Sequence, residues 1–450
     1  MIGRFPWDPF PPGEPEPKGP DPLASLAYRA AVTAADAYRS VRLALRRESG
    51  TLRVGNRFVP DARYREVAFL AFGHAANSMA LAALHAIGDR LTQGFVAGPE
   101  PVSRELPFRG ITLEPGWGGA PQAPSALGAA TEIASALTEQ DLLLVLLSPG
   151  ALRGLALPPP GMTAEEFSTF LATAHERGAS GREVALLARV LGTGGVGGRL
   201  ATRAPRCDVA TFIVERGDGP AVVGGGPMYP VAPTERVEAA TLADRLGLLG
   251  SLPATASDAL SVGGETAPAP PPGVGRPLVV ASPADALRAA ADALFDKGWT
   301  SRLAFLQVRD NPETSADRFL TRVEELIAAE GLTAESRTKG IAAFAMMTLG
   351  LPEGVDEGPT LGRFLVRSEA GLRRREMSLG LFRTAGAVGS DSFPAGAVVG
   401  APGDPAARAQ PGRARAILMR PGVTDVGLLA AALYPTPAPP DRGPPKGHDA

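Results

Sequence analysis

The sequence contains little lysine, cysteine or histidine. Of its 45 cationic residues, only Lys18, Lys297, Lys339 and Lys446 are lysines, a bias that we attribute to nucleotide composition. Because Cys207 is the sole cysteine, no intramolecular disulfide can form, and the four histidines are too scattered to give a Cys/His zinc pattern. This cysteine usage indicates a reducing compartment.

Long apolar runs and a charge excess are also lacking. The densest apolar run, Leu142–Leu147, is far shorter than the ~18 residues that a membrane span needs, and the segment after Met1 has no apolar signal core. A net charge of −2 gives no reason to expect nucleic acid or an anionic membrane as a partner. We therefore expect a cytoplasmic protein that binds neither.

Glycine and proline are abundant, with 54 and 45 residues, which favours many loops, while 44% apolar residues leave enough side chains for a core. Length predicts two or three domains. The Pro-rich segments 1–22 and 435–450 are predicted to be tails. Between them, the segment 263–277 (GGETAPAPPPGVGRP) is the best linker candidate and divides a domain at 23–262 from one at 278–434.

Short apolar runs followed by turns and helices dominate the chain. Apolar residues at helical spacing predict one long helix over 23–47, and 51–59 is β-like. The later strand candidates are Val67–Phe72, Leu142–Leu147, Val209–Val214 and Leu278–Ala281, and helices are expected over Ala75–Ile87 and Ala284–Phe295. Strands that alternate with helices predict a parallel sheet covered on both faces.

Ligands of such a sheet bind beyond the carboxyl ends of the strands, where helix N-termini offer N–H groups to anions. Four loops are placed there by the predicted order: 73–74, 148–151, 192–199, and 215–219 with 224–227. None of them has the spacing of a Walker or dinucleotide-binding motif. Ser282 is a predicted N-cap, with Pro283 at the first helical position and Asp285 near the positive end of the helix dipole.

The order and the amino-acid sequences of these loops resemble those of the glycerate 2-kinase family. The resemblance is carried by Ala27–Leu84, Asp141–Leu171 (DLLLVLLSPGALRGL and onward), Gly197–Pro230 (GGRLATRAPRCDV and onward) and Leu278–Trp299, and it is continuous from about 27 to 327. It implies an α/β protein of two domains: an N-terminal Rossmann-like parallel sheet with helices on both faces, and a smaller α/β C-terminal domain of MOFRL type. Such enzymes use ATP and Mg²⁺ to phosphorylate the 2-hydroxyl of D-glycerate in an interdomain cleft. Homodimerisation is left open.

The resemblance also implies site residues. It assigns Glu215 and Asp218 to the metal, and Asp218 and Arg373 to catalysis. The positions implied to bind substrate or nucleotide are His74, Ser148, Gly150, Arg189, Gly197, Gly198, Arg199, Gly217, Gly226 and Ser282.

Several polar groups of the family motifs are replaced here. Leu152, Val190, Val196 and Ala221 stand where the family has serine, basic or acidic residues, and His74 stands in place of a lysine. Phosphoryl transfer needs cations and metal ions around the phosphate oxygens, and none of the four apolar residues supplies them. An imidazole is only partly protonated at neutral pH.

Each candidate also has a structural interpretation. His74 could serve as a cap or a filler, the acids of 215–218 as ordinary turn residues, Gly197–Arg199 as a helix-ending turn, and Arg373–Arg375 as a solvated basic face. Two functions follow. One is an active or diverged ATP-dependent glycerate kinase; the other is a non-catalytic relative that serves as a ligand-binding or regulatory partner. The replaced polar groups favour the second.

Overall fold

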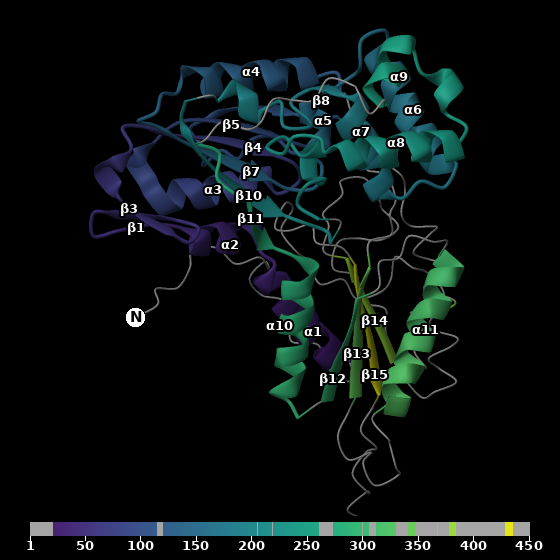
Figure 1. Cartoon of the computed structure of the whole chain (residues 1–450). Coiled ribbons are helices and arrows are strands. Elements are labelled where there is room, and N and C mark those ends of the chain that lie inside the picture. The colour runs from purple at the N-terminus through teal and green to yellow at the C-terminus, as the bar shows by residue number, and fades with distance from the viewer. Residues whose placement is uncertain are drawn as a thin grey trace, which may run out of the picture.

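A computed structural model shows a six-stranded parallel sheet covered by helices and a second, four-stranded sheet (Figure 1). The residues that it describes are 21–114, 120–204, 206–217, 219–260, 273–298, 300–305, 312–329, 341–347, 367, 378–383 and 428–434. Within them, no helix is long and apolar enough to cross a membrane.

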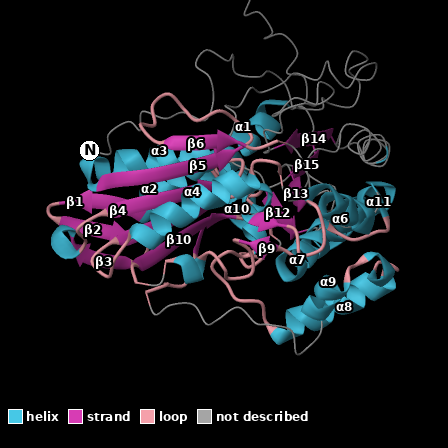
Figure 2. Ribbon diagram, turned by 90° about the horizontal axis from the view of Figure 1, so that it is seen from above, coloured by secondary structure: helices cyan, strands magenta, loops and turns pink. Residues whose placement is uncertain are grey.

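The first sheet confirms the predicted parallel α/β architecture. Its strands are β4 (Val67–Phe72), β5 (Leu91–Gly98), β6 (Arg109–Thr112), β7 (Leu142–Leu147), β10 (Asp208–Val214) and β11 (Leu278–Ala281). They lie in the order β11-β10-β7-β4-β5-β6, and every pair is parallel. Viewed from above, β5 and β6 run side by side with their arrowheads pointing the same way (Figure 2). The first strand of this sheet along the chain, β4, lies in the middle. The chain then adds β5 and β6 on one side of β4 and returns to place β7, β10 and β11 on the other side. The strand order therefore reverses between β4 and β7, as in Rossmann folds.

The central strands β4 and β7 are buried on both faces of the sheet, which explains their unbroken apolar sequences. Alternate residues serve opposite cores: Leu144 of β7 packs into one cluster and Val145 into the other. The helix α3 (Ala76–Ile87) lies below the sheet in Figure 1, and α4 (Ala123–Ala136) lies above it. The other helices and short strands of this part are α5 (Leu152–Leu155), α6 (Ala164–Glu176), α7 (Gly181–Leu191), α8 (Pro233–Arg245), α9 (Ala254–Leu260), β8 (Ala156–Leu157) and β9 (Thr193–Gly194).

The start of the chain corrects one prediction. Instead of a single helix over 23–47, the structure has α1 (Asp21–Ala34) and α2 (Ala37–Ala44). Asp36 is the N-cap of the second helix, because its carboxylate accepts hydrogen bonds from the N–H groups of Tyr38 at 2.8 Å and Arg39 at 3.2 Å. The β-like stretch that follows belongs to an antiparallel meander of β1 (Leu45–Glu48), β2 (Thr51–Val54) and β3 (Arg57–Pro60).

The second sheet is mixed. Its strands are β12 (Thr300–Phe305), β13 (Ile341–Met347), β14 (Ser378–Arg383) and β15 (Leu428–Tyr434), in the order β12-β13-β15-β14. β12 and β13 are parallel, and β15 is antiparallel to both of its neighbours. The helix α11 (Pro312–Ala329) follows β12 and contacts β13.

The two sheets are joined through α10 (Pro283–Phe295), which begins as predicted. The Ser282 hydroxyl accepts from the Asp285 N–H at 3.4 Å and donates to its carboxylate at 2.7 Å. Leu278 of β11 pairs with Phe212 of β10, so the chain after the proposed linker returns to the first sheet before α10 leads to β12. Most of that linker, residues 263–272, lies outside the described residues, and so do both predicted tails except residues 21 and 22. The domain division stays a prediction.

Candidate functional site

Three of the predicted loops, at 73–74, 148–151 and 215–217, lie at one edge of the first sheet, whereas the loop 192–199 follows the helix α7 and not a strand of this sheet, which corrects its predicted position. Phe72 lies beside Leu147, and Leu147 lies beside Ile213, so the segments that follow β4, β7 and β10 leave the sheet at the same end. The described candidates brought to this edge are His74, Ser148, Gly150, Glu215, Gly217 and Ser282. The first three flank the point where the strand order reverses, which is where Rossmann-type sheets bind ligands.

The turns after β4 and β7 are bonded to each other. The His74 N–H donates to the Pro149 carbonyl at 2.8 Å. The Ser148 hydroxyl accepts from the Ala75 N–H at 3.0 Å and donates to the Phe72 carbonyl at 3.3 Å. Gly73 adopts φ +110°, and a Cβ there would lie 2.3 Å from the Ser148 carbonyl oxygen. Ser148 therefore holds this turn closed and takes up an N–H group at the start of α3.

His74 has an acidic neighbour that the sequence did not reveal. The His74 side chain is buried. The acidic neighbour is Glu100, which follows β5 and whose pKa is influenced by the charge of His74. Burial raises the pKa of the half-buried Glu100 carboxyl, and His74 opposes that rise. The cue in the sequence was the short apolar run Phe95–Gly98, which ends directly before this loop.

Arg189, a predicted nucleotide-binding residue, lies in a buried framework. Its guanidinium donates to both carboxylate oxygens of Glu235, at 3.1 and 3.2 Å. It donates further to four backbone carbonyls, those of Ala221, Gly225, Gly226 and Pro230, at 2.8 to 3.2 Å. Since a guanidinium has five N–H donors, these contacts use its whole hydrogen-bonding capacity. The side chain fastens the glycine loop 224–226 to α7 and α8.

The Gly197-Gly198 turn is engaged in the same framework. The Gly197 N–H donates to the Gly225 carbonyl, and the Gly198 N–H to the Gly226 carbonyl, both at 2.9 Å. The Arg199 guanidinium donates to two backbone carbonyls of its own loop, those of residues 192 and 196, at 3.1 and 3.2 Å. The N–H donors of this turn are thus bonded within the chain.

The structure describes only some of the residues predicted for the metal and for catalysis. Glu215 follows β10, and its N–H donates to the Ala281 carbonyl at 3.0 Å, which fixes it beside the end of β11. Gly217 has φ +90°, as a turn glycine requires. Asp218 and Arg373 lie outside the described residues, so their predicted roles stay predictions. Among the residues that the structure describes, no three His, Cys, Asp or Glu side chains form a group able to hold a metal ion.

Comparison with known proteins decides the family. Residues 23–261 match a family model described as a domain of unknown function, DUF4147. The chain belongs to the DUF4147 family. This domain is the N-terminal domain of MOFRL-family glycerate kinases, so the resemblance predicted from the loops is confirmed.

The relatives that this DUF4147 chain matches are named glycerate kinases. A glycerate kinase of Bos taurus is 31% identical over 237 residues, covering 49% of this chain and 44% of the relative. A glycerate kinase of Homo sapiens is 32% identical over 209 residues, covering 43% of this chain and 39% of the relative. The matched region thus spans less than half the length of either relative.

Solved structures share the fold. A glycerate kinase of Thermotoga maritima aligns with a TM-score of 0.65 at 18% identity, over 92% of this chain and 100% of that one. The PH0495 protein of Pyrococcus horikoshii aligns with a TM-score of 0.68 at 17% identity, over 93% of this chain and 99% of that one. The likeness therefore extends beyond the DUF4147 domain to the later part of the chain.

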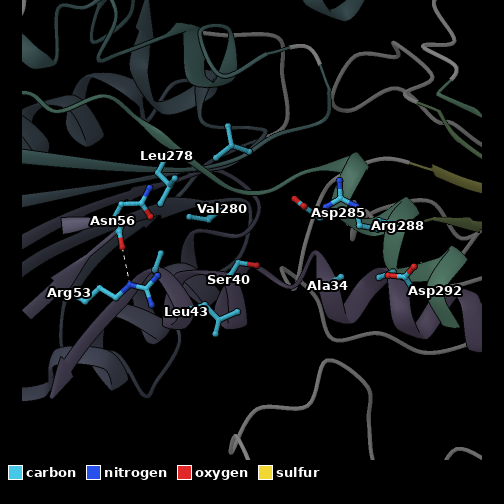
Figure 3. Close-up of a pocket in the computed structure, with 14 residues that line it drawn as sticks. Ala34, Ser40, Leu43, Arg53, Asn56, Leu278, Val280, Asp285, Arg288 and Asp292 are labelled. Carbon is cyan, nitrogen blue, oxygen red and sulfur yellow. Dashed lines mark hydrogen bonds between the residues drawn. The ribbon is translucent and has the colours of Figure 1, made fainter. Parts of the chain in front are cut away.

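A separate groove of about 490 Å³ lies where the DUF4147 domain meets α10 (Figure 3). Arg53 and Asn56 line one side, and Asp285, Arg288 and Asp292 line the α10 side. None of the predicted site residues is among its lining residues. The groove and the candidate site are thus different places, and the site is defined by the strand ends.

Proposed function

We propose that this chain is a glycerate kinase-like protein of two domains that binds a small hydroxy acid at the carboxyl edge of the six-stranded sheet. Its ATP- and Mg²⁺-dependent phosphorylation of D-glycerate is impaired, or directed to a related hydroxy acid. Family membership and the reversal of strand order beside His74 and Ser148 support the binding site. The proposed impairment is supported by the Arg189 guanidinium, whose N–H donors are all bonded to Glu235 and to backbone carbonyls of the chain itself.

The chemistry of the edge suits the metal better than the nucleotide. Carboxylate oxygens are the ligands that Mg²⁺ prefers, and Glu215 with Asp218 would supply them. Bound Mg²⁺ would neutralise charge on the phosphate oxygens. The N–H groups of Gly197 and Gly198 are bonded to backbone carbonyls, so they do not form a preformed phosphate cradle. Loss of this cradle is expected to weaken ATP positioning.

The second candidate is a non-catalytic relative that acts as a ligand-binding or regulatory protein. It is favoured by the engagement of two candidate arginines, Arg189 and Arg199, with the backbone of the chain itself. In both cases we propose a cytoplasmic location, with a hydroxy acid and, for an active enzyme, a nucleotide as ligands.

The test is transfer of labelled phosphate from ATP to D-glycerate with Mg²⁺ at high protein concentration. We expect turnover at least about 10³-fold below that of an intact family member, as when a phosphate-binding arginine is lost. The turnover should disappear in a Glu215→Ala/Asp218→Ala variant. Absence of turnover in the unaltered chain, with the intact relative active, would support the non-catalytic candidate. Turnover that survives in the variant would contradict the metal assignment.

A further inference from the structure

The groove beside α10 has two polar walls. One wall is the turn between β2 and β3, which carries Arg53 and Asn56. The other wall is a face of α10, where Asp285, Arg288 and Asp292 follow one another at helical spacing (Figure 3). The volume of the groove, about 490 Å³, lies within the usual range of small-molecule sites.

The Arg53 guanidinium is held in place by its own hairpin. Its Nε–H donates to the Gly55 carbonyl at 2.9 Å, and its Cζ lies 5.6 Å from the centre of the Phe58 ring. The turn is itself fixed, because the Gly55 N–H donates at 2.7 Å to the carbonyl of Ala44, the last residue of α2. Among the residues that the structure describes, none bonds the Nη atoms of Arg53, so their N–H donors are available to a ligand.

Arg53 also has a neighbour of the same charge. Arg46 of β1 lies directly opposite it in the antiparallel register. Like charges in this arrangement destabilise a sheet. Arg46 has a countercharge, since Glu48 lies 3.5 Å away, whereas Arg53 forms no ion pair with any residue of the described part of the chain. A bound anionic group would supply the missing countercharge at Arg53.

The two walls of the groove carry opposite net charges. Arg53 makes the turn wall positive, and two carboxylates against one guanidinium make the α10 wall negative. Within the described ranges, no ion pair joins Arg53 to Asp285 or Asp292, and the groove separates them. Asp285 is bonded to the Ser282 hydroxyl at 2.7 Å, whereas the Asp292 carboxylate has no hydrogen-bond partner among the described residues. A ligand of separated positive and negative charge would match both walls.

We propose that the groove is a binding site for a small zwitterion of the amino acid type. Its carboxylate accepts hydrogen bonds from the Arg53 guanidinium and the Asn56 amide, and its ammonium group donates to the Asp292 carboxylate. The inference goes beyond the proposed function, because the groove shares no lining residue with the site at the strand ends. A ligand that contacts both walls connects the β2–β3 hairpin to α10, the helix that leads to the second sheet.

The experiment measures binding of L-serine and 4-aminobutyrate, two zwitterions of different charge separation, by calorimetry at pH 7 and low salt. We expect Arg53→Gln and Asp292→Asn in the full-length protein each to bind about tenfold more weakly, the effect of one lost charge-assisted hydrogen bond. The matched control is Arg57→Gln, at an exposed arginine of the same hairpin outside the groove, which should bind as the unaltered chain does. Arg288→Gln should bind more tightly, since it makes the α10 wall more negative.

Analogues of the ligand test the need for both charges. Butyrate and butylamine each keep one charge of 4-aminobutyrate, and each should bind at least about tenfold more weakly than the zwitterion. If Arg53→Gln does not fold, Arg53→Lys takes its place, since it keeps the positive charge but loses the planar fork of donors. Its affinity for both zwitterions should lie between those of the unaltered chain and Asp292→Asn.

The inference is overturned if neither zwitterion binds to the unaltered chain, or if Arg53→Gln binds as well as the unaltered chain does. Weaker binding in Arg288→Gln would mark an anion site and would also overturn it. Loss of binding in His74→Gln, with the groove variants unchanged, would place the probe at the strand ends instead. D-Glycerate binding should be the same in Arg53→Gln and the unaltered chain, so the proposed function is tested separately.

Discussion

Arg189 and Glu235 form a partly buried, two-pronged ion pair between α7 and α8, with N–O distances of 3.1 and 3.2 Å. The Arg189 side chain is 1% exposed and that of Glu235 is 22% exposed. The same guanidinium bonds the carbonyls of Gly225 and Gly226, whose loop in turn accepts from the Gly197-Gly198 turn. One arginine thus maintains the backbone of two glycine turns that the family resemblance assigned to substrate or nucleotide binding.

Replacing Arg189 should destabilise the protein. Arg189→Met leaves the Glu235 carboxylate and several carbonyls without their donor, and breaking a buried pair in this way costs about 3–5 kcal/mol. Urea unfolding at pH 7 measures the loss. The matched control is Arg182→Met, whose ion pair with Glu238 is partly exposed and should contribute less than about 1 kcal/mol. Equal losses in the two variants would contradict the framework role.

Gly226 should tolerate no side chain. It has φ +60°, and a Cβ there would lie 2.3 Å from the Ala221 carbonyl oxygen and 1.6 Å from Arg189 Nη1. Gly219 also has a positive φ, of +95°, with nothing within 4 Å of its Cβ position. We expect Gly219→Ala to cost about 1–2 kcal/mol from backbone strain alone. Gly226→Ala should cost clearly more in the same unfolding assay, and a similar loss in both would show that the loop can move aside.

Asp141 should make stability depend on pH. Burial raises the pKa of its carboxyl, but hydrogen bonds from the Thr138 N–H and hydroxyl, at 2.8 and 2.7 Å, and from Arg65 outweigh burial and leave the pKa below its ordinary 3.8. Because the folded pKa is lowered, this stabilisation is present above the ordinary value and is lost as the pH falls through the lowered one. Asp141→Asn should therefore be about 1.5–3 kcal/mol less stable at pH 7.

As the pH falls below about 4, the free energy of unfolding should also decrease less steeply for Asp141→Asn than for the unaltered protein. Urea unfolding across pH 2.5–7 checks both expectations. Asp89→Asn, at a carboxylate with an exposed fraction of 84%, is the comparison that should change little. Parallel profiles for Asp141→Asn and the unaltered chain would exclude this carboxylate as a source of acid sensitivity.

The central strands were predictable because burial on both faces leaves only apolar residues. The runs at Val67–Phe72 and Leu142–Leu147 match β4 and β7 at both ends. By contrast, β5 was missed because Thr92, Gln93 and Gly94 interrupt its apolar pattern. The break between α1 and α2 was missed as well, since the apolar spacing continues across it and a single carboxylate makes the cap.

The site was predictable in its location more than in its chemistry. Strand order alone brings His74 and Ser148 together, and motif order placed Glu215 at the same edge. The partner of Arg189 lies 46 positions away, and no local pattern links the two residues. Whether an arginine meets a ligand or a buried carboxylate is decided by tertiary packing, which the spacing of residues along the chain does not record.

The packing of α1 against α10 constrains the order of folding during synthesis. Tyr28, Ala31 and Val32 of α1 are fully buried, and α10 supplies a large part of the contacting surface. All six strands of the first sheet are synthesised before α10, so α1 cannot pack against α10 until late in translation. Until then its apolar face has to be shielded by transient contacts or by chaperones, and a chain stopped before residue 283 would keep that face uncovered and prone to aggregate.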